Sequence, residues 1–332
     1  MIKNARIQWP DILKAFAIIL VIIGHVVSTY DVRGYDSPIA RWIYSFHMPL
    51  FMMLSGMFFK YTLDKPFWSM IKIKCRTLLL PLFSWSIILL LFQLIVTTPF
   101  SEWEPCVKDW ILSGGPLRGY WYLKCLFLYL VIGYISVELL KNELIAAITT
   151  TALFLIFPNV NFSKMMILFF WFGYGYNIVN QFVTNRGGYI AIFALIMAGC
   201  YLVGWYKYTY LGVNSIEDYC KFIIMGTSSS LFWIMLFNLL FKNNSHNSFV
   251  RFIAWIGTVS LGIYCLHVLF YDPLVFGTVL GDISKYATPI YLFWSFMALI
   301  FCLIIIKVIL KSPLLSFLLL GKEYSRSAEI ES

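Results

Sequence analysis

Three ionisable side chains lie within or beside the first long apolar segment of the sequence: Asp11, Lys14 and His25. Ionisable residues are costly inside a bilayer, and those that occur there usually face a protein interior and carry function. Lys14 and His25 are about three helical turns apart, so their side chains share one helix face, separated by about 16 Å along the axis. This spacing predicts a polar path from one membrane surface into the bilayer.

Two more histidines, His47 and His267, fall inside other apolar segments at a similar expected depth. A single intramembrane histidine could simply bond a backbone carbonyl, but three favour a cavity lined by imidazoles. Such an imidazole suits a general base that takes a proton from an attacking hydroxyl. Arg41, Trp121 and Tyr122 are expected near the outer ends of their helices, around this cavity. Taken alone, the Trp-Tyr pair is more typical of an interfacial aromatic belt.

A basic run, Lys72-Ile-Lys74-Cys-Arg76, precedes Pro81 and is expected in the cytoplasmic loop between the second and third apolar segments. Two interpretations are open. Basic cytoplasmic loops arise routinely from membrane topology and contact with anionic lipids. The same run could hold the phosphates of a cytoplasmic substrate. Spacing alone favours the first interpretation.

The composition indicates an all-α polytopic membrane protein. The chain has 332 residues, of which 61% are hydrophobic and 12% charged, and its mean hydropathy is +0.80. Soluble domains are closer to a quarter charged. The apolar runs are continuous rather than alternating, which excludes a barrel. About ten runs approach the length of a membrane-spanning helix: residues 12–30, 39–60, 77–97, 120–138, 143–157, 163–180, 188–206, 219–241, 250–271 and 288–310.

The distribution of Lys and Arg between loops predicts that both termini are cytoplasmic. The net charge of +9 is then mainly a topology signal, and nothing else supports nucleic-acid binding. The N-terminal segment lacks the cleavage site of a signal peptide. We therefore expect one integral-membrane domain over residues 1–332, with helices from about 12 to 310 and a cytoplasmic tail at 311–332. The fourth histidine, His246, is expected in a polar loop.

The sequence lacks the motifs of several common catalytic and metal-binding sites. The seven cysteines are scattered and form no disulfide framework or metal-binding motif. No G-x-S-x-G elbow, P-loop or H-E-x-x-H motif occurs. A transporter or flippase of a lipid-linked sugar would fit the composition, and from the helical bundle alone it is the leading interpretation. A non-catalytic sensor or scaffold is a further interpretation that stays open.

Five short motifs occur in order along nearly the whole chain: Asp11 and Lys14 with Gly24-His25; Phe46-His-Met-Pro-Leu-Phe51 with Ser55-Gly56; Lys72, Lys74 and Arg76 before Pro81; Trp121-Tyr122-Leu123; and Gly257, Ser260, Gly262, Ile263, Tyr264 and His267. Together they resemble the motifs of acyltransferase family 3, the multi-pass membrane acyltransferases. The third motif departs from the Arg-x-x-Arg of many members, because only Arg76 has a match and Lys72 and Lys74 would serve as point charges.

The resemblance implies an enzyme of the plasma membrane without a bound cofactor or metal. It would move an acyl group, usually acetyl, from cytoplasmic acyl-CoA to a hydroxyl of an extracytoplasmic or lipid-linked carbohydrate. The family's essential histidine maps to His25 and its basic partner to Lys14. The expected partners are acyl-CoA, a glycan or lipid-linked sugar, and membrane lipids. The acceptor sugar, the acyl chain and the oligomeric state stay open.

The expected reaction path starts at the cytoplasmic face. The phosphates of acyl-CoA would lie near Lys72, Lys74 and Arg76, and its pantetheine arm would follow the stripe holding Asp11 and Lys14. His25 would act as a general base or carry the acyl group transiently, and the sequence leaves both roles open. The residues expected at the acceptor end are Arg41, His47, Trp121, Tyr122, Ser260, Tyr264 and His267.

Overall fold

The computed structural model is helical wherever it describes regular secondary structure, and no strand occurs among its described residues. These are residues 8–31, 33–96, 98–115, 120–156, 162–183, 216–241, 247–271 and 288–323, with residues 197 and 199. The expected span at 188–206 lies almost entirely outside them, and so does His246. Five helices within this part are long and apolar enough to cross a membrane, or six if one bent pair is a single span. They support a membrane protein.

Most expected spans correspond to helices. Long helices match 12–30, 77–97, 120–138, 219–241 and 288–310, and shorter apolar helices match 143–157 and 163–180. The longer elements are α1 Trp9–Tyr30, α5 Phe67–Lys74, η2 Cys75–Leu79, α6 Leu80–Val96, α8 Trp121–Leu140, α9 Glu143–Ile156, α10 Phe162–Val183, α12 Ile216–Phe241 and α17 Thr288–Lys311. The shorter elements are η1 Gly34–Asp36, α2 Pro38–Tyr44, α3 His47–Met57, α4 Lys60–Leu63, η3 Phe100–Glu102, α7 Trp103–Leu112, α13 Ser248–Thr258, α14 Ser260–Leu266, α15 Val268–Tyr271 and α18 Pro313–Leu320.

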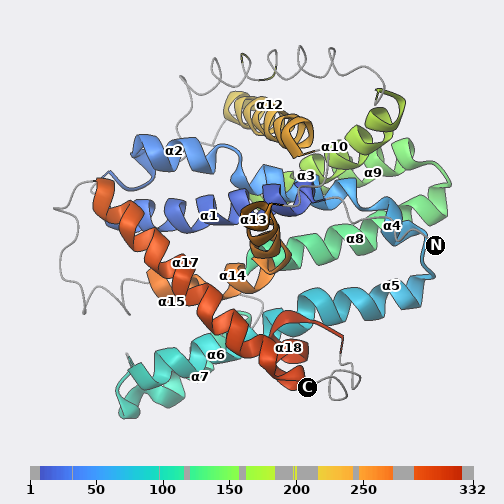
Figure 1. Ribbon diagram of the computed structural model, residues 1–332. Coiled ribbons are helices and arrows are strands. Elements are labelled where there is room, and N and C mark those ends of the chain that lie inside the picture. Colours follow the sequence, from blue (N-terminus) through green and yellow to red (C-terminus); the bar gives the residue numbers. More distant parts are fainter. Residues whose placement is uncertain are drawn as a thin grey trace.

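Helix α1 is the central element of the fold. It begins with proline in its first turn and an acidic residue, Asp11, close behind, both of which suit a helix N-terminus. It packs against α2, α3, α12, α13, α14 and α17. Figure 1 shows α12 on one side of α1 and α3, with α8 and then α5 on the other. This central position buries most of α1, which explains how the helix can carry ionisable side chains.

The expected span at 39–60 is broken into α2 and α3 at Ser45 and Phe46. Pro49 lies in the first turn of α3, where its missing N–H costs least, whereas an uninterrupted helix would lose a hydrogen bond there. Side chains satisfy carbonyls freed by the break. The Ser45 hydroxyl donates to the Trp42 carbonyl at 2.6 Å, and His47 Nδ1 donates to the Ile43 carbonyl at 2.8 Å. The break therefore fixes the His47 ring.

The basic run does not form the expected loop. Residues Phe67–Val96 make one apolar helical stretch of 30 residues, formed by α5, η2 and α6. Lys72 and Lys74 lie in the last turn of α5, and Arg76 lies in η2, a single π-helical turn. The span therefore begins about ten residues earlier than the sequence predicts, because the basic side chains alternate with apolar ones on a helix. Such π-turns often occur at functional sites.

The last two expected features also differ from the structure. The expected span at 250–271 bends by 58° between α13 and α14. Part of the expected tail forms α18, which packs on α6 and α17. The Trp85 indole N–H donates to the Leu319 carbonyl at 2.9 Å, so α18 is tied to α6. The α18 segment is rich in Leu and Phe, so it can bury an apolar face against other helices, which favours packing over a solvated tail.

Glycines bring helix backbones into direct contact at two places. A Cβ on Gly56 of α3 would lie 1.9 Å from the Phe170 carbonyl oxygen of α10. A Cβ on Gly257 of α13 would lie 1.7 Å from the Asp11 carbonyl oxygen of α1. Small residues at helix crossings allow this close approach. The motif glycines Gly56 and Gly257 therefore hold α3 and α13 at their places around α1 and α10.

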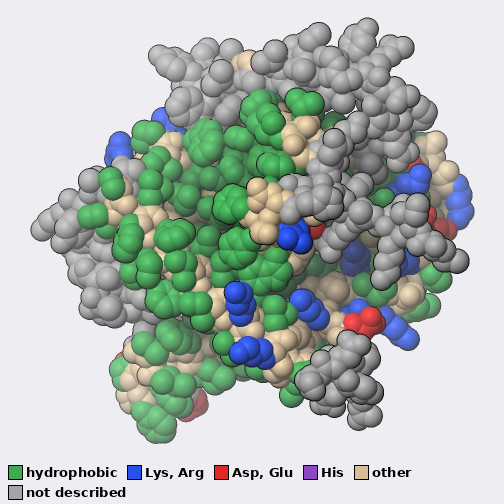
Figure 2. All heavy atoms as spheres, viewed as in Figure 1, with side chains coloured by type: hydrophobic (Ala, Val, Ile, Leu, Met, Phe, Trp, Pro, Cys, Tyr) green, Lys and Arg blue, Asp and Glu red, His purple; other side chains and the backbone are tan. Residues whose placement is uncertain are grey.

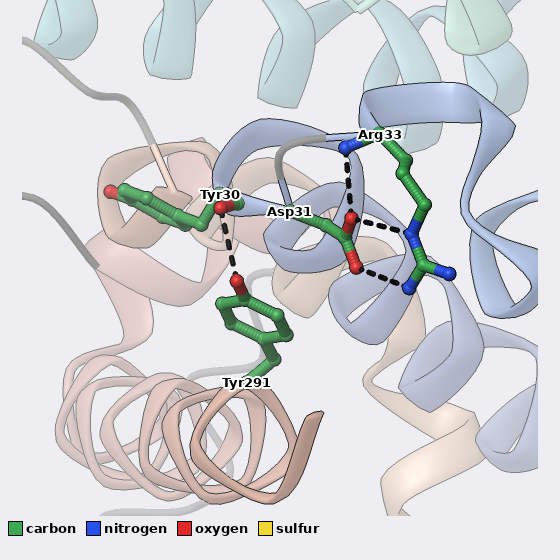
Figure 3. A network of polar contacts seen from close by, with 4 residues as sticks. All are labelled: Tyr30, Asp31, Arg33 and Tyr291. Atoms are coloured by element: carbon green, nitrogen blue, oxygen red, sulfur yellow. Dashed lines mark hydrogen bonds and ion pairs between the residues drawn. The ribbon is translucent and has the colours of Figure 1, made fainter. Parts of the chain in front are cut away.

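Polar contacts close the C-terminal end of α1 (Figure 3). The Tyr291 hydroxyl of α17 donates to the Tyr30 carbonyl at 3.1 Å. Just beyond the helix, the Arg33 side chain forms two hydrogen bonds with the Asp31 carboxylate, each 3.0 Å long. These bonds hold the pKa of Asp31 below its usual range. The end of α1 and the start of α17 are thus linked.

Apolar side chains cover much of the face of the molecule seen in Figure 2, and Lys and Arg lie below its centre and at its edges. Large exposed apolar side chains occur along α6, α9 and α17, among them Leu91, Ile148 and Phe293. A soluble protein rarely exposes so much apolar area, whereas lipid contact accounts for it.

The Gly257 contact makes a stability prediction. We expect Gly257→Ala to lower the free energy of unfolding by about 1–3 kcal/mol or more, the usual cost of overpacking, because its Cβ would meet backbone rather than a movable side chain. Thermal unfolding in detergent measures this. Gly175→Ala is the matched control, since a Cβ there meets nothing within 4 Å. Equal stability of both variants would contradict the close α1–α13 contact.

Candidate active site

A cavity of about 330 Å³ opens among the motif-bearing helices. Its volume lies at the lower end of the range of small-molecule sites. Its walls come from α1, α3, α5, η2, α8, α13 and α14, with one residue of α4. The polar and charged residues that line it are Asp11, Lys14, Ser55, Thr62, Lys74, Tyr122, Thr258, Ser260 and Tyr264.

Two lysines from different helices, Lys14 and Lys74, lie in the wall of this cavity. Lys14 Nζ is 3.4 Å from Asp11 Oδ1 and 5.6 Å from the Phe58 ring centroid. The Lys14 side chain is 31% exposed, whereas that of Asp11 is only 6% exposed. Asp11 is thus buried and orients Lys14, whose side chain is still partly exposed.

The expected donor-binding run contributes one residue to the cavity. Lys74 lines it, but Lys72 is exposed and does not. Arg76 forms an ion pair with Glu323, with Nη1 and Oε1 2.9 Å apart. The helical form of the run separates Lys74 from the other two side chains, because positions two apart on a helix point in different directions whereas positions four apart share a face.

Two tyrosines, Tyr122 and Tyr264, also line the cavity. The Tyr122 hydroxyl lies 3.0 Å from Ser55 Oγ, and the Tyr122 and Tyr264 ring centroids are 5.9 Å apart. Ser260 lies on the same helix as Tyr264 and also lines the cavity. Tyr122 is therefore a buried wall residue and not a member of an aromatic belt. Trp121, half-buried, packs its ring edge-on against Tyr122 but does not line the cavity.

The three intramembrane histidines come together, as their expected depth predicts. The His25 and His267 ring centroids are 5.2 Å apart. His47 joins them through Tyr44, whose ring centroid lies 5.9 Å from that of His25 and 4.9 Å from that of His47. His47 and His267 are buried, whereas His25 is partly exposed. His25 is thus the imidazole of this cluster with surface left for a substrate.

The histidine cluster lies behind the cavity and does not line it, which differs from the expected arrangement. Tyr264 connects the two, because it lines the cavity and its ring centroid is 5.7 Å from that of His267. His47 follows the break at Ser45 and His267 follows the bend after α13; the His267 ring packs on His25 of α1, and the His47 ring packs on Tyr44 of α2. Arg41 is half-buried in α2, one turn before Tyr44, and also does not line the cavity.

Two residues beside His25, Ser28 and Tyr44, were not among the site residues predicted from the sequence. Tyr44 Oη lies 3.1 Å from His25 Nδ1 and 3.1 Å from Ser28 Oγ. Ser28 follows His25 by three positions, so their shared helix face was a usable signal. Tyr44 reaches the site from a different helix and had no comparable signal. Within the described ranges, no group of three His, Cys, Asp or Glu side chains is placed to hold a metal ion.

Comparison with known proteins extends these observations. The family model described as "Acyltransferase domain" matches residues 7–317. Nodulation protein NolL of Mesorhizobium japonicum is 28% identical over 241 residues, which cover 67% of this chain and 63% of that protein. Nodulation protein NolL of Sinorhizobium fredii is 32% identical over 118 residues, 34% of this chain and 32% of that protein. No solved structure matches.

The chain therefore spans less than two thirds of the length of the curated relatives it matches. The family match, by contrast, covers nearly the whole chain and includes all five motifs, from Asp11 to His267. The helices that carry these motifs surround the cavity and the histidine cluster described above. The chain belongs to acyltransferase family 3.

Proposed function

We propose that this protein transfers an acyl group, by preference acetyl, from cytoplasmic acyl-CoA to a hydroxyl of an extracytoplasmic or lipid-linked carbohydrate. One observation carries the proposal. A cavity lined by Lys14 and Lys74 is also lined by Tyr264, whose ring contacts that of His267, and the His267 ring contacts that of His25. This chain of contacts supports a donor held by the two lysines and a general base, His25, at the other end, which is what transfer from an anionic thioester would need.

The two lysines suit the donor end of this route. Lys14 and Lys74 supply positive charge within a confined cavity, where charge-assisted hydrogen bonds to phosphate are strong. Asp11 holds Lys14 in place through their contact at 3.4 Å. The apolar remainder of the wall, including Phe51, Leu126 and Leu261, suits a thin and largely uncharged arm. Acyl-CoA combines these two chemistries.

His25 suits the chemical step. As a general base, it takes the proton of the acceptor hydroxyl while the hydroxyl oxygen attacks the thioester carbon. The carbon–sulfur bond breaks, a carbon–oxygen ester bond forms, and CoA leaves as the thiolate. As an acyl carrier, His25 would attack the thioester first and pass the acyl group to the hydroxyl. The partial exposure of His25 supports either role.

The acceptor is proposed to reach His25 from the side away from the cavity. Arg41, His47 and Trp121 remain candidates for acceptor contacts, because they belong to the helices that surround His25 and Tyr122. A carbohydrate hydroxyl fits this region, since tryptophan and arginine offer a flat ring and hydrogen-bond donors. In the same proposal, the protein spans the plasma membrane with the donor on the cytoplasmic side.

The catalytic role proposed for His25 can be tested by substitution. We expect His25→Ala to lower acyl transfer by at least about 10²-fold, because general-base catalysis contributes about 10²–10⁴-fold. The assay measures CoA thiol release and acylated glycan with purified protein in lipid vesicles. His246→Ala is the control, since its position is expected in a polar loop. Normal acyl transfer by His25→Ala would refute the role of His25. Sugar translocation without thiol release would favour the transporter alternative.

Substitution of Lys74 and Lys72 tests whether the donor binds in the cavity or on the protein surface. We expect Lys74→Ala to raise the KM for acyl-CoA about tenfold, the effect of losing one charge-assisted hydrogen bond of roughly 1.5 kcal/mol. Lys72→Ala should change this KM much less, because Lys72 is exposed and does not line the cavity. Initial rates against acyl-CoA concentration give both values. Equal effects of the two substitutions would contradict donor entry through the cavity.

A further inference from the structure

A short hydrogen-bonded circuit involves His25 on the side of its Nδ1 atom. Tyr44 Oη lies 3.1 Å from His25 Nδ1. Ser28 Oγ lies 3.1 Å from Tyr44 Oη and donates to the His25 carbonyl oxygen at 3.2 Å. The circuit thus begins at the His25 ring, passes through two hydroxyls and returns to the His25 backbone. It joins α1 to α2, and Tyr44 is buried within it.

The direction of each hydrogen bond in this circuit follows from counting hydrogens. A serine hydroxyl has a single hydrogen, and that of Ser28 goes to a carbonyl, which can only accept. Ser28 therefore accepts in its contact with Tyr44, and the tyrosine hydrogen is used there. The Tyr44 oxygen must then accept in its contact with His25. The reverse direction would lose the bond to the His25 carbonyl.

We infer that Tyr44 and Ser28 are positioning residues that hold neutral His25 in the tautomer with its hydrogen on Nδ1. The lone pair then resides on Nε2, which becomes the nitrogen that takes the proton of the acceptor or attacks the thioester. The hydrogen bond made by one ring nitrogen sets the state of the other, which is how orienting groups act on catalytic histidines. This inference rests on the proposed function only for what Nε2 does, because the tautomer itself is a property of the protein alone.

The two neighbouring histidines are expected to have the same tautomer for a different reason. His47 Nδ1 lies 2.8 Å from the Ile43 carbonyl, and His267 Nδ1 lies 2.6 Å from the Tyr264 carbonyl. Carbonyl oxygens only accept, so both Nδ1 atoms carry hydrogen. Their bonds do not involve Tyr44 or Ser28. They therefore serve as internal references for any change confined to His25.

Nitrogen NMR of the ring-¹⁵N-histidine protein in lipid vesicles tests the assignment directly, at a pH where the imidazoles are neutral. The His25 signals are those missing from His25→Gln. We expect a protonated Nδ1 and an unprotonated Nε2 for His25 in the unaltered protein. In Tyr44→Phe, and to a smaller extent in Ser28→Ala, the His25 population should shift toward hydrogen on Nε2. The His47 and His267 signals should stay in place.

An activity measurement accompanies the spectra. We expect Tyr44→Phe to lower kcat by about tenfold or more, within the ~10²–10⁴-fold that a general base contributes, with the KM for acyl-CoA unchanged. Tyr35→Phe is the matched control, because its ring packs on Tyr44 with centroids 5.0 Å apart but its hydroxyl is not in the circuit. Its kcat and its spectra should match those of the unaltered protein.

Two spectroscopic results would overturn the inference. One is hydrogen on Nε2 of His25 in the unaltered protein. The other is a His25 tautomer that Tyr44→Phe and Ser28→Ala both leave unchanged. Failure of the proposed function gives a different pattern, in which the tautomer responds to Tyr44→Phe while His25→Ala still transfers acyl groups.

Discussion

The burial of ionisable groups on α1 is the constraint on which the rest of the structure depends. A helix carrying Asp11, Lys14 and His25 is costly in lipid, and it becomes tolerable only when other helices surround it. Helices α2, α3, α12, α13 and α17 do so, and Gly257 allows α13 to approach the α1 backbone directly. The packing that shields these groups also builds the cavity beside them. Stability and site formation therefore share one cause.

Breaks in the helices give the site its chemistry. The interruption at Ser45 and the bend between α13 and α14 allow His47 and His267 to approach α1, while freed carbonyls at the first break are bonded by side chains. Irregular backbone at membrane depth is tolerated only where protein or water covers it. Here it lies against the central helix. A bundle of unbroken helices would offer fewer directions from which side chains reach one point.

The sequence predicted much of this arrangement. Hydrophobic run length identified most helices, since that signal depends on composition alone, and rare intramembrane histidines identified a cluster that did form. Local conformation was harder. The basic run around Lys74 was expected as a loop, because charge frequency does not distinguish a loop from a helix with one polar face. The role of Tyr44 was missed, because its approach to His25 depends on how α2 packs on α1.

We propose that the donor lies in the cavity, with its acyl end directed toward the histidine cluster. An experimental structure of the protein with an unreactive acyl-CoA analogue tests this most directly. We expect the pantetheine arm to lie between Lys14 and Lys74 and the acyl end to lie against Tyr264, on the side of His267 and His25. An analogue bound on the outer surface of the helices, with the cavity left unfilled, would contradict it.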